Sequence, residues 1–426
     1  MGGVDEVPAR SQVGLEMVTG VLAEVRAPQP MVPRARRATE SPDRPIRLCR
    51  MSRYVSGVGA SPSSQPADSL ADMKLGLNLG YWGMGNDADN IALAQEADRT
   101  GYSVVWAAEA YGSDTATVLS WVGALTKNVD LGSAVMQIPA RTPAMTAMTA
   151  ATLDTLSGGR FRLGLGVSGP QVSEGWHGVK FDAPLGRTRE YVDIVRMALR
   201  RETVAYQGKH WTLPLPDGPG KALRMTIHPV REHLPIYLAA VGPKNLELAG
   251  EIADGWLAVF FSPEHSDDLL ASLTVGRARA GHGTEDDRLA GFDVVPTVPV
   301  ILNDDVAVAA GPLRAYSALY LGGMGSREKN FYNALAVRMG FAEGAAKVQD
   351  LFLARQHREA AAAVPLEFID QTALIGPRDR VKNRLSRYAA SGVTTLTIAA
   401  EGASLDERLH VVRTMAELLD ESGLAD

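Results

Sequence analysis

The sequence predicts an α/β protein whose main part is a (β/α)8 TIM barrel with insertions, preceded by a disordered N-terminal extension. From Met73 onward, eight short apolar segments typical of buried strands alternate with amphipathic segments typical of helices. A doubly wound open sheet is the alternative, and it would usually carry GxGxxG in its first strand–helix turn. That turn, residues 80–86, reads GYWGMGN, and no acidic strand end follows at the expected place. The barrel is therefore the favoured fold.

The composition is that of a globular protein without a nucleic-acid or membrane partner. The chain has 426 residues, 46% hydrophobic and 22% charged, with a net charge of -6, so it has no basic field to attract nucleic acid or anionic lipid. No apolar run approaches the roughly 20 residues of a membrane span. The single cysteine, Cys49, excludes a disulfide framework, and the eight histidines show no HExxH spacing. We expect a metal-free protein of the reducing cytoplasm that acts on a small molecule.

The first 72 residues differ from the rest. They are rich in Pro, Ser, Arg and Ala, show no lasting periodicity and lack the apolar region of a secretory signal. They are predicted to be a disordered extension, or to precede a genuine start at Met73. A contact patch of Arg34, Arg36 and Arg37 is a less favoured alternative. The predicted division is 1–72, extension, and 73–426, barrel.

The first four strand–helix units occupy residues 74–201. Strands are predicted at 74–79, 103–108, 129–138 and 160–167. Helices are predicted at 89–100, 115–127, 143–156 and 186–201, the third with proline in the first turn, where it is tolerated.

The last four units are interrupted twice. Strands are predicted at 235–240, 255–261, 292–302 and 394–399, and helices at 244–252, 263–280, 304–321, 378–391 and 404–421. A β-hairpin at 203–213 precedes the fifth strand, and an irregular helical insertion at 322–364 follows the seventh unit.

The residues that follow the strands should gather at the carboxyl-terminal mouth of the barrel, where such folds place their active sites. They are Tyr81 and Trp82 after the first strand, Glu109, Ala110 and Tyr111 after the second, Ala134, Val135 and Gln137 in the third, Ser168 and Gly169 after the fourth, and Val241, Gly242 and Pro243 after the fifth. This set is aromatic and small, with few charges, which favours a large planar organic ligand over a hydrolytic centre. Tyr81, Trp82 and Trp176 are the candidate substrate pocket.

Each candidate also has a plainer explanation. Trp82 and Trp176 could be core aromatics. Glu109 ends the apolar strand VVWAA, and because carboxylates are rarely buried unless paired, a working role is favoured. His177 fits a surface loop and a substrate pocket equally well. Residues 241–245 lead from a strand into a helix, and they could cradle a phosphate at the helix N-terminus or form a simple short loop.

The chain resembles the luciferase-like monooxygenase superfamily in several stretches, which read LNLGYWG, VVWAAEAYGSD, LGSAVMQIPARTP, LSGGRFRLGLGVSGPQVSEGWHGV, PLGRTREYVDIVR and YLAAVGPKNLELAGEIADGW. The resemblance is to its actinobacterial branch of oxidoreductases that depend on coenzyme F420, an 8-hydroxy-5-deazaflavin, and it runs from about Met73 to the C-terminus. It implies the same barrel, and dimers are common in the family, so a homodimer is an open possibility.

The resemblance also implies roles for single residues. Glu109 stands where relatives place an acid against the deazaflavin, and Ala134 and Val135 match a bulge whose non-prolyl cis peptide backs the ring. The remaining cofactor contacts that it implies are Gln137 at the ring, Ser168, Gly169 and Ser173 in the loop after the fourth strand, and Val241, Gly242, Lys244 and Asn245 near the phosphate-bearing side chain.

Two positions depart from the family pattern. Ala110 stands where the sugar-phosphate and alcohol dehydrogenases have a histidine, and Pro170 where the sugar-phosphate enzymes have a glutamate. Oxidising an alcohol requires a base, so the implied activity is hydride transfer that reduces an activated C=C or C=N bond. Glu109, His177 or solvent would supply the proton. Desolvation would favour a protonated Glu109, although a ring hydrogen bond is its family role.

Two other functions stay open. One is an FMN-dependent monooxygenase on the same fold, and the other is a non-catalytic carrier that binds a deazaflavin or flavin.

Overall fold

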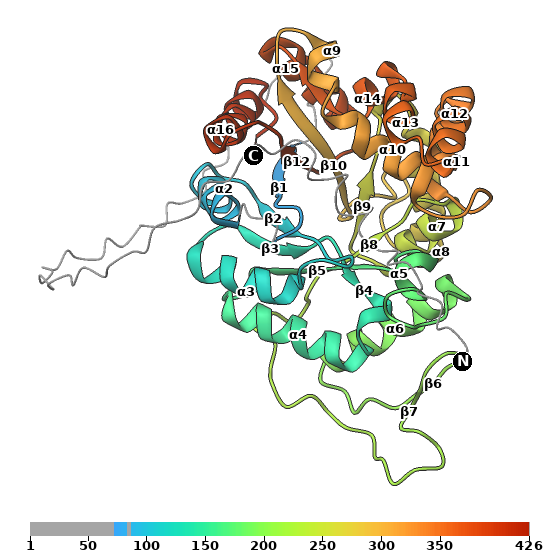
Figure 1. Cartoon of the computed structure of the whole chain (residues 1–426). Coiled ribbons are helices and arrows are strands. Elements are labelled where there is room, and N and C mark those ends of the chain that lie inside the picture. The colour runs from blue at the N-terminus through green and yellow to red at the C-terminus, as the bar shows by residue number, and fades with distance from the viewer. Residues whose placement is uncertain (1–71, 83–86, 426) are drawn as a thin grey trace, which may run out of the picture. The chain divides into compact units, whose positions relative to one another are not determined.

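Eight parallel strands close into a ring in the computed structural model, which describes residues 72–82 and 87–425 (Figure 1). The ring runs through β1 (Lys74–Asn78), β2 (Val104–Ala107), β3 (Asp130–Ser133), β5 (Phe161–Gly166), β8 (Ile236–Ala239), β9 (Gly255–Val259), β10 (Asp293–Leu302) and β12 (Thr395–Ala400). Lys74 pairs with Thr395, so β12 returns to β1 and closes the ring. The predicted (β/α)8 barrel is confirmed.

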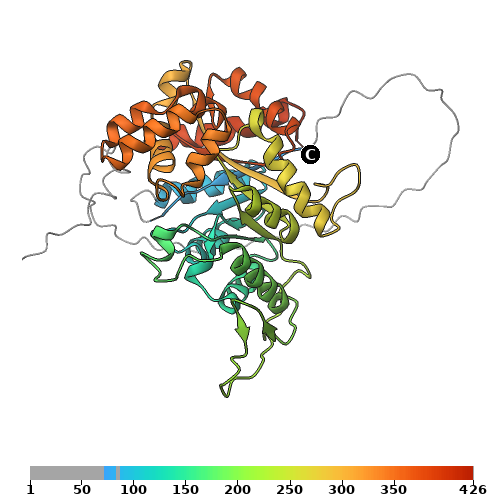
Figure 2. The same ribbon diagram turned by 90° about the vertical axis from the view of Figure 1, so that its right-hand side faces the viewer.

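Helices surround the strands in both views (Figures 1 and 2). They are α2 (Asp87–Arg99), α3 (Thr115–Leu125), α4 (Pro143–Leu156), α6 (Pro184–Leu199), α7 (Pro243–Ile252), α8 (Asp267–Arg279), α15 (Arg378–Ala390) and α16 (Leu405–Glu421). Side-chain caps fix several starts: Asp114 accepts from the Thr117 N–H, Thr142 from Met145 and Ser404 from Glu407. The predicted helix 143–156 is reproduced at both ends.

The strands are buried on both faces, as expected for a parallel barrel. Val105 belongs to the large core between strands and helices, whereas its neighbours Val104 and Trp106 belong to a smaller cluster inside the barrel, with Tyr237. The Trp106 and Tyr237 rings meet edge to face at 5.4 Å. A Cβ on Gly132 would lie 2.1 Å from the Trp106 ring, so only glycine fits beside this indole.

Some elements differ from the prediction for identifiable reasons. The predicted helix 304–321 is two helices, α9 (Val306–Ala310) and α10 (Leu313–Gly323), because Pro312 lacks the N–H that a continuous helix needs. The predicted helix 263–280 begins with the 3-10 turn η2 (Pro263–His265) and continues as α8. The short elements α5 (Pro170–Ser173) and β11 (Leu374–Gly376), which pairs with β10, were not predicted.

Both predicted insertions are present. The hairpin is short, with β6 (Tyr206–Gln207) antiparallel to β7 (Thr212–Leu213). The helical insertion comprises α11 (Phe331–Arg338), α12 (Ala342–Leu353) and α13 (His357–Ala363), and it continues past the predicted end at residue 364 into α14 (Leu366–Gln371). With α10 it forms one group of orange and red helices in Figure 2.

The prediction of an N-terminal extension falls on residues 1–72, which lie outside the described ranges apart from Asp72. Gly83 and Gly85 of the first strand–helix turn lie outside them too. Among the described residues, no helix combines the length and the apolar character that crossing a membrane requires.

Candidate active site at the barrel mouth

Glu109 directly follows the β2 end and is held by three neighbours. Arg141 approaches its two carboxylate oxygens with Nη1 and Nη2, both at 2.7 Å. The backbone N–H groups of Thr115 and Gln137 donate to it at 3.2 Å each. The carboxylate side chain is only 7% exposed. The Arg141 guanidinium and the two backbone N–H groups therefore all donate to the Glu109 carboxylate, which accepts in each of these hydrogen bonds.

Arg141 also reaches Asp114, the N-cap of α3, and so ties the end of β2 to the start of that helix. Burial acts to lower the pKa of Arg141, but the Glu109 and Asp114 carboxylates outweigh this effect and raise it. The sequence analysis did not select Arg141. The signal was present, because a buried carboxylate requires a cation nearby, but the partner lies 32 residues further along the chain.

The predicted third strand is broken by a bulge. β3 ends at Ser133 and resumes as β4 (Met136–Gln137), which also pairs with β5. Gly132 pairs with Arg162 and Met136 with Leu165, so this strand carries one residue more than β5. The Ser133 hydroxyl fills the gap: it donates to the Gly164 carbonyl at 2.8 Å and accepts from the Gly164 N–H at 2.9 Å. The Ala134–Val135 peptide is cis, as the resemblance implies.

The bulge gives the mouth an apolar floor. Ala134, Val135 and Ala239 are half-buried and pack on the cluster inside the barrel. Their side chains are small, and Val135 lies over Gly166, where a Cβ would be only 2.6 Å from its methyl group. A floor of this kind suits the face of a planar ring.

Gln137 connects three strand ends beside this floor. Its side-chain N–H donates to the Ala110 carbonyl at 2.5 Å, and its side-chain oxygen accepts from the Ser168 hydroxyl at 2.9 Å. Ser168 has φ +61°, a left-handed conformation that non-glycine residues adopt mainly where the surroundings require it. Glu109, Gln137 and Ser168 are therefore brought together in one network.

Three of the predicted site residues lie in the loop after β5, and their surroundings differ. The Ser173 hydroxyl is buried and donates to the Val179 carbonyl at 2.7 Å, so it holds the loop in shape. Trp176 is 66% exposed, and the core alternative for it is wrong. His177 is half-buried, and its Nε2 is buried without a hydrogen-bond partner. Trp82 is half-buried too, and its indole N–H likewise has no partner.

The loop after β8 leads into α7. Gly242 is the N-cap without a side-chain cap, and the space above its Cα is open. Asn245 donates to the Ala239 carbonyl at 3.4 Å, whereas Lys244 is 77% exposed and pairs with Glu247 on its own helix. Arg338 of α11 donates to the Val241 carbonyl at 3.3 Å.

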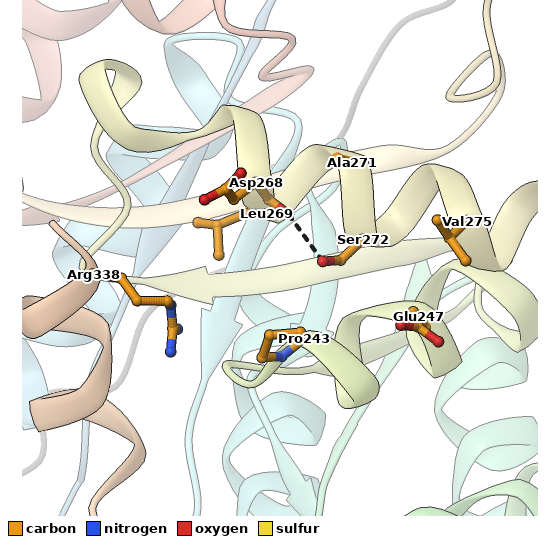
Figure 3. A pocket seen from close by; sticks show the side chains of 8 residues that line it. All are labelled: Pro243, Glu247, Asp268, Leu269, Ala271, Ser272, Val275 and Arg338. Atoms are coloured by element: carbon orange, nitrogen blue, oxygen red, sulfur yellow. Dashed lines mark hydrogen bonds between the residues drawn. The ribbon is translucent and has the colours of Figure 1, made fainter.

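A hollow of about 360 Å³ adjoins this loop. Its lining comes from α7, α8 and α11 and includes Pro243 and Arg338 (Figure 3). The Arg338 guanidinium extends from α11 toward it. The Arg338 guanidinium and the uncapped helix N-terminus would attract a negatively charged group, whereas the Glu247 and Asp268 carboxylates in the same lining would oppose it.

Together these features fit a deazaflavin cofactor. The floor would take the ring, the polar atoms of Gln137 and Ser168 would lie at its side, and the α7 N-terminus with Arg338 would attract a phosphate.

Comparison with known proteins identifies the family of the chain. The family model of luciferase-like monooxygenases matches residues 78–395. A protein of Mycobacterium tuberculosis described as a coenzyme F420-dependent oxidoreductase is 45% identical over 340 residues, which are 78% of this chain and 96% of that protein. A 5,10-methylenetetrahydromethanopterin reductase of Archaeoglobus fulgidus is 26% identical over 70% of this chain and 85% of its own length.

Solved structures share the fold. The coenzyme F420-dependent tetrahydromethanopterin reductase from Methanopyrus kandleri superposes with a TM-score of 0.69 at 22% identity, covering 82% of this chain and 98% of that one. Because the family model matches most of the chain and a relative is 45% identical in sequence, this chain belongs to the luciferase-like monooxygenase family.

Proposed function

We propose that the protein is an oxidoreductase that uses coenzyme F420 and exchanges a hydride with a small organic substrate. The observation that carries the proposal is the 45% identity, over 96% of that relative's length, to a protein described as a coenzyme F420-dependent oxidoreductase. The apolar floor of Ala134, Val135 and Ala239 supports it, because it offers a flat support of the kind a deazaflavin ring needs. When bound, the deazaflavin supplies or takes up the hydride.

The residues of this chain would hold the cofactor and control the proton. Gln137 and Ser168 are positioned to orient the ring edge, and Glu109 keeps Gln137 in place through its backbone N–H. Because Glu109 accepts from Arg141 and two N–H groups, we assign it to orientation and not to proton donation. His177 retains a free ring nitrogen and is the candidate proton donor.

Tryptophan fluorescence can test this proposal, because Trp176 and Trp121 are similarly exposed, at 66% and 62%, on different elements. Titrating oxidised F420 should quench the fluorescence, and Trp176→Phe should remove part of that quenching while Trp121→Phe on α3 should not. F420 should also bind more tightly than FMN. Tighter binding of FMN, with oxygen consumption after its reduction, would replace the proposal by the monooxygenase alternative.

Binding of F420 without turnover on any reducible substrate would instead indicate the carrier.

A further inference from the structure

Tyr191 lies behind the turn between β4 and α4, which carries Arg141. It belongs to α6, and its side chain is fully buried. Its hydroxyl oxygen is 3.2 Å from the carbonyl oxygen of Arg141 and 3.4 Å from that of Thr142, the N-cap of α4. A side chain of α6 therefore contacts the backbone of the residue that holds the Glu109 carboxylate.

The direction of these hydrogen bonds follows from the chemistry of the partners. A carbonyl oxygen only accepts, so Tyr191 donates its single hydroxyl proton toward the turn. Its oxygen can then accept, and the hydroxyl of Thr146, a buried residue of α4, lies 2.6 Å from it and donates. Burial raises the pKa of Tyr191 to about 12, so the hydroxyl keeps its proton near neutral pH.

The hairpin insertion holds the Tyr191 ring in place. The Trp211 ring, next to β7, meets it edge to face at 6.2 Å. Glu190, which precedes Tyr191 on α6, accepts from the backbone N–H groups of the three hairpin residues 209–211 at 2.8, 2.8 and 2.9 Å. Because the ring is packed on one side and α6 is tied to the hairpin beside it, the hydroxyl is fixed against the Arg141 turn.

Arg141 passes this support on to the candidate cofactor contacts. Its guanidinium donates to both carboxylate oxygens of Glu109 at 2.7 Å, and Glu109 accepts from the Gln137 N–H. Tyr81 of the predicted substrate pocket follows β1 and is 46% exposed, whereas Tyr191 is fully buried and cannot contact a ligand. An effect of Tyr191 on the cofactor therefore has to reach the site through the Arg141 turn.

We propose that Tyr191 is a positioning residue of the cofactor site: its hydroxyl fixes the Arg141 turn, so that Arg141 and Glu109 hold Gln137 at the side of the bound deazaflavin ring. This inference rests on the proposed function. A tyrosine that only stabilised the fold would leave the F420 affinity of the folded protein unchanged when its hydroxyl is removed. A positioning residue would lower that affinity.

Tyr191→Phe tests the inference, because it keeps the ring and removes only the hydroxyl. Fluorescence titration should show F420 binding about three- to tenfold more weakly than to the parent, a modest coupling for residues in one hydrogen-bond network. Tyr102→Phe is the matched control, since the buried Tyr102 hydroxyl also donates to a carbonyl group, that of Val412 at 2.9 Å, but precedes β2 at the other end of the barrel. It should lower the melting temperature by a similar amount and keep the F420 affinity of the parent.

A double-mutant cycle tests the route through Arg141. Glu109→Gln already breaks the ion pair, so adding Tyr191→Phe should weaken F420 binding by less than about twofold further. Additive losses would show that Tyr191 acts on the cofactor by another route. That result, unchanged affinity in Tyr191→Phe, or equal losses of affinity in Tyr191→Phe and Tyr102→Phe would each overturn the inference.

Cofactor binding by the parent protein, measured first, keeps the two proposals distinguishable. F420 binding by the parent together with unchanged affinity in Tyr191→Phe would refute the positioning role and leave the proposed function standing. If the parent binds FMN in place of F420, the proposed function fails, and the same variants titrated with FMN still test the positioning role. A parent that binds neither cofactor would refute both.

Discussion

Glu109 and Arg141 form a two-pronged ion pair at the rim of the barrel, with both nitrogen–oxygen distances at 2.7 Å. The pair is largely shielded from water, since the side chains are 7% and 14% exposed. It fixes the end of β2 against the turn after β4, and through Asp114 against the start of α3. The rigidity of the mouth therefore depends on an arginine that would not touch the reacting atoms.

Replacing that arginine should destabilise the protein. Arg141→Gln leaves the Glu109 and Asp114 carboxylates without their cation, and removing one partner of a buried pair costs roughly 3–5 kcal/mol. We expect a loss of about 3 kcal/mol in the free energy of unfolding, measured by urea denaturation. Arg327→Gln is the control, because its pair with Asp350 is more than half exposed and such pairs contribute at most about 1 kcal/mol. Similar losses in the two variants would refute the importance of burial.

Glu109→Gln should separate orientation from proton donation. The amide keeps the shape but loses the ion pair, so we expect weaker F420 binding and a smaller effect on single-turnover hydride transfer in the saturated enzyme. A lost proton donor would typically cost about 10²–10⁴ in rate. A collapse of the single-turnover rate at unchanged F420 affinity would identify Glu109 as the donor, contrary to its contacts.

Ser133→Ala should show what the bulge requires. The Ser133 hydroxyl is the acceptor for the buried Gly164 N–H. Without it, that donor is unpaired, at a cost of about 1–3 kcal/mol in unfolding free energy. Ser120→Ala removes a hydroxyl from the exposed face of α3 and should change stability by less than about 0.5 kcal/mol. Equal effects in thermal denaturation would show that backbone groups rearrange to compensate.

Glu401 gives a prediction about pH. It follows β12, and although the residue is exposed, loss of hydration to the protein around it raises the pKa of its carboxyl despite the opposing charge of Arg408. A raised pKa means that the ionised form is less stable in the folded protein than in the unfolded chain. The penalty is absent below the unfolded pKa and appears as pH rises through the folded one. Glu401→Gln should therefore match the parent near pH 4 and melt about 1–2 °C higher near pH 8. A difference independent of pH would contradict this.

The alternation of strands and helices could be predicted from the sequence, but most of the places where a strand or helix is interrupted could not. The strand predicted at 129–138 contains no proline or other break, and nothing in its pattern shows that Ser133 is needed to bridge an extra residue. Gly311–Pro312, in contrast, was a readable break in the helix predicted at 304–321. β11 has only three residues, too few for a pattern.

The candidate site was predicted in part for similar reasons. Strand ends identify Glu109, Gln137 and Ser168, because a parallel barrel brings them to one face. Tyr316 and Tyr320 lie in a helix of the insertion, and their spacing shows only that they share a helix face. That this face packs against Phe260, which follows β9, depends on the tertiary fold alone.

The pairing of β1 with β12 joins residues about 320 positions apart, such as Lys74 and Thr395. During synthesis at about 5–20 residues per second, β1 would wait roughly 15–60 s before its second neighbour exists. Until then it presents an open, apolar strand edge, which is the kind of surface that pairs with other chains. The last strand is thus also the one that protects the first, and nascent chains that stall before it are the ones most exposed to aggregation.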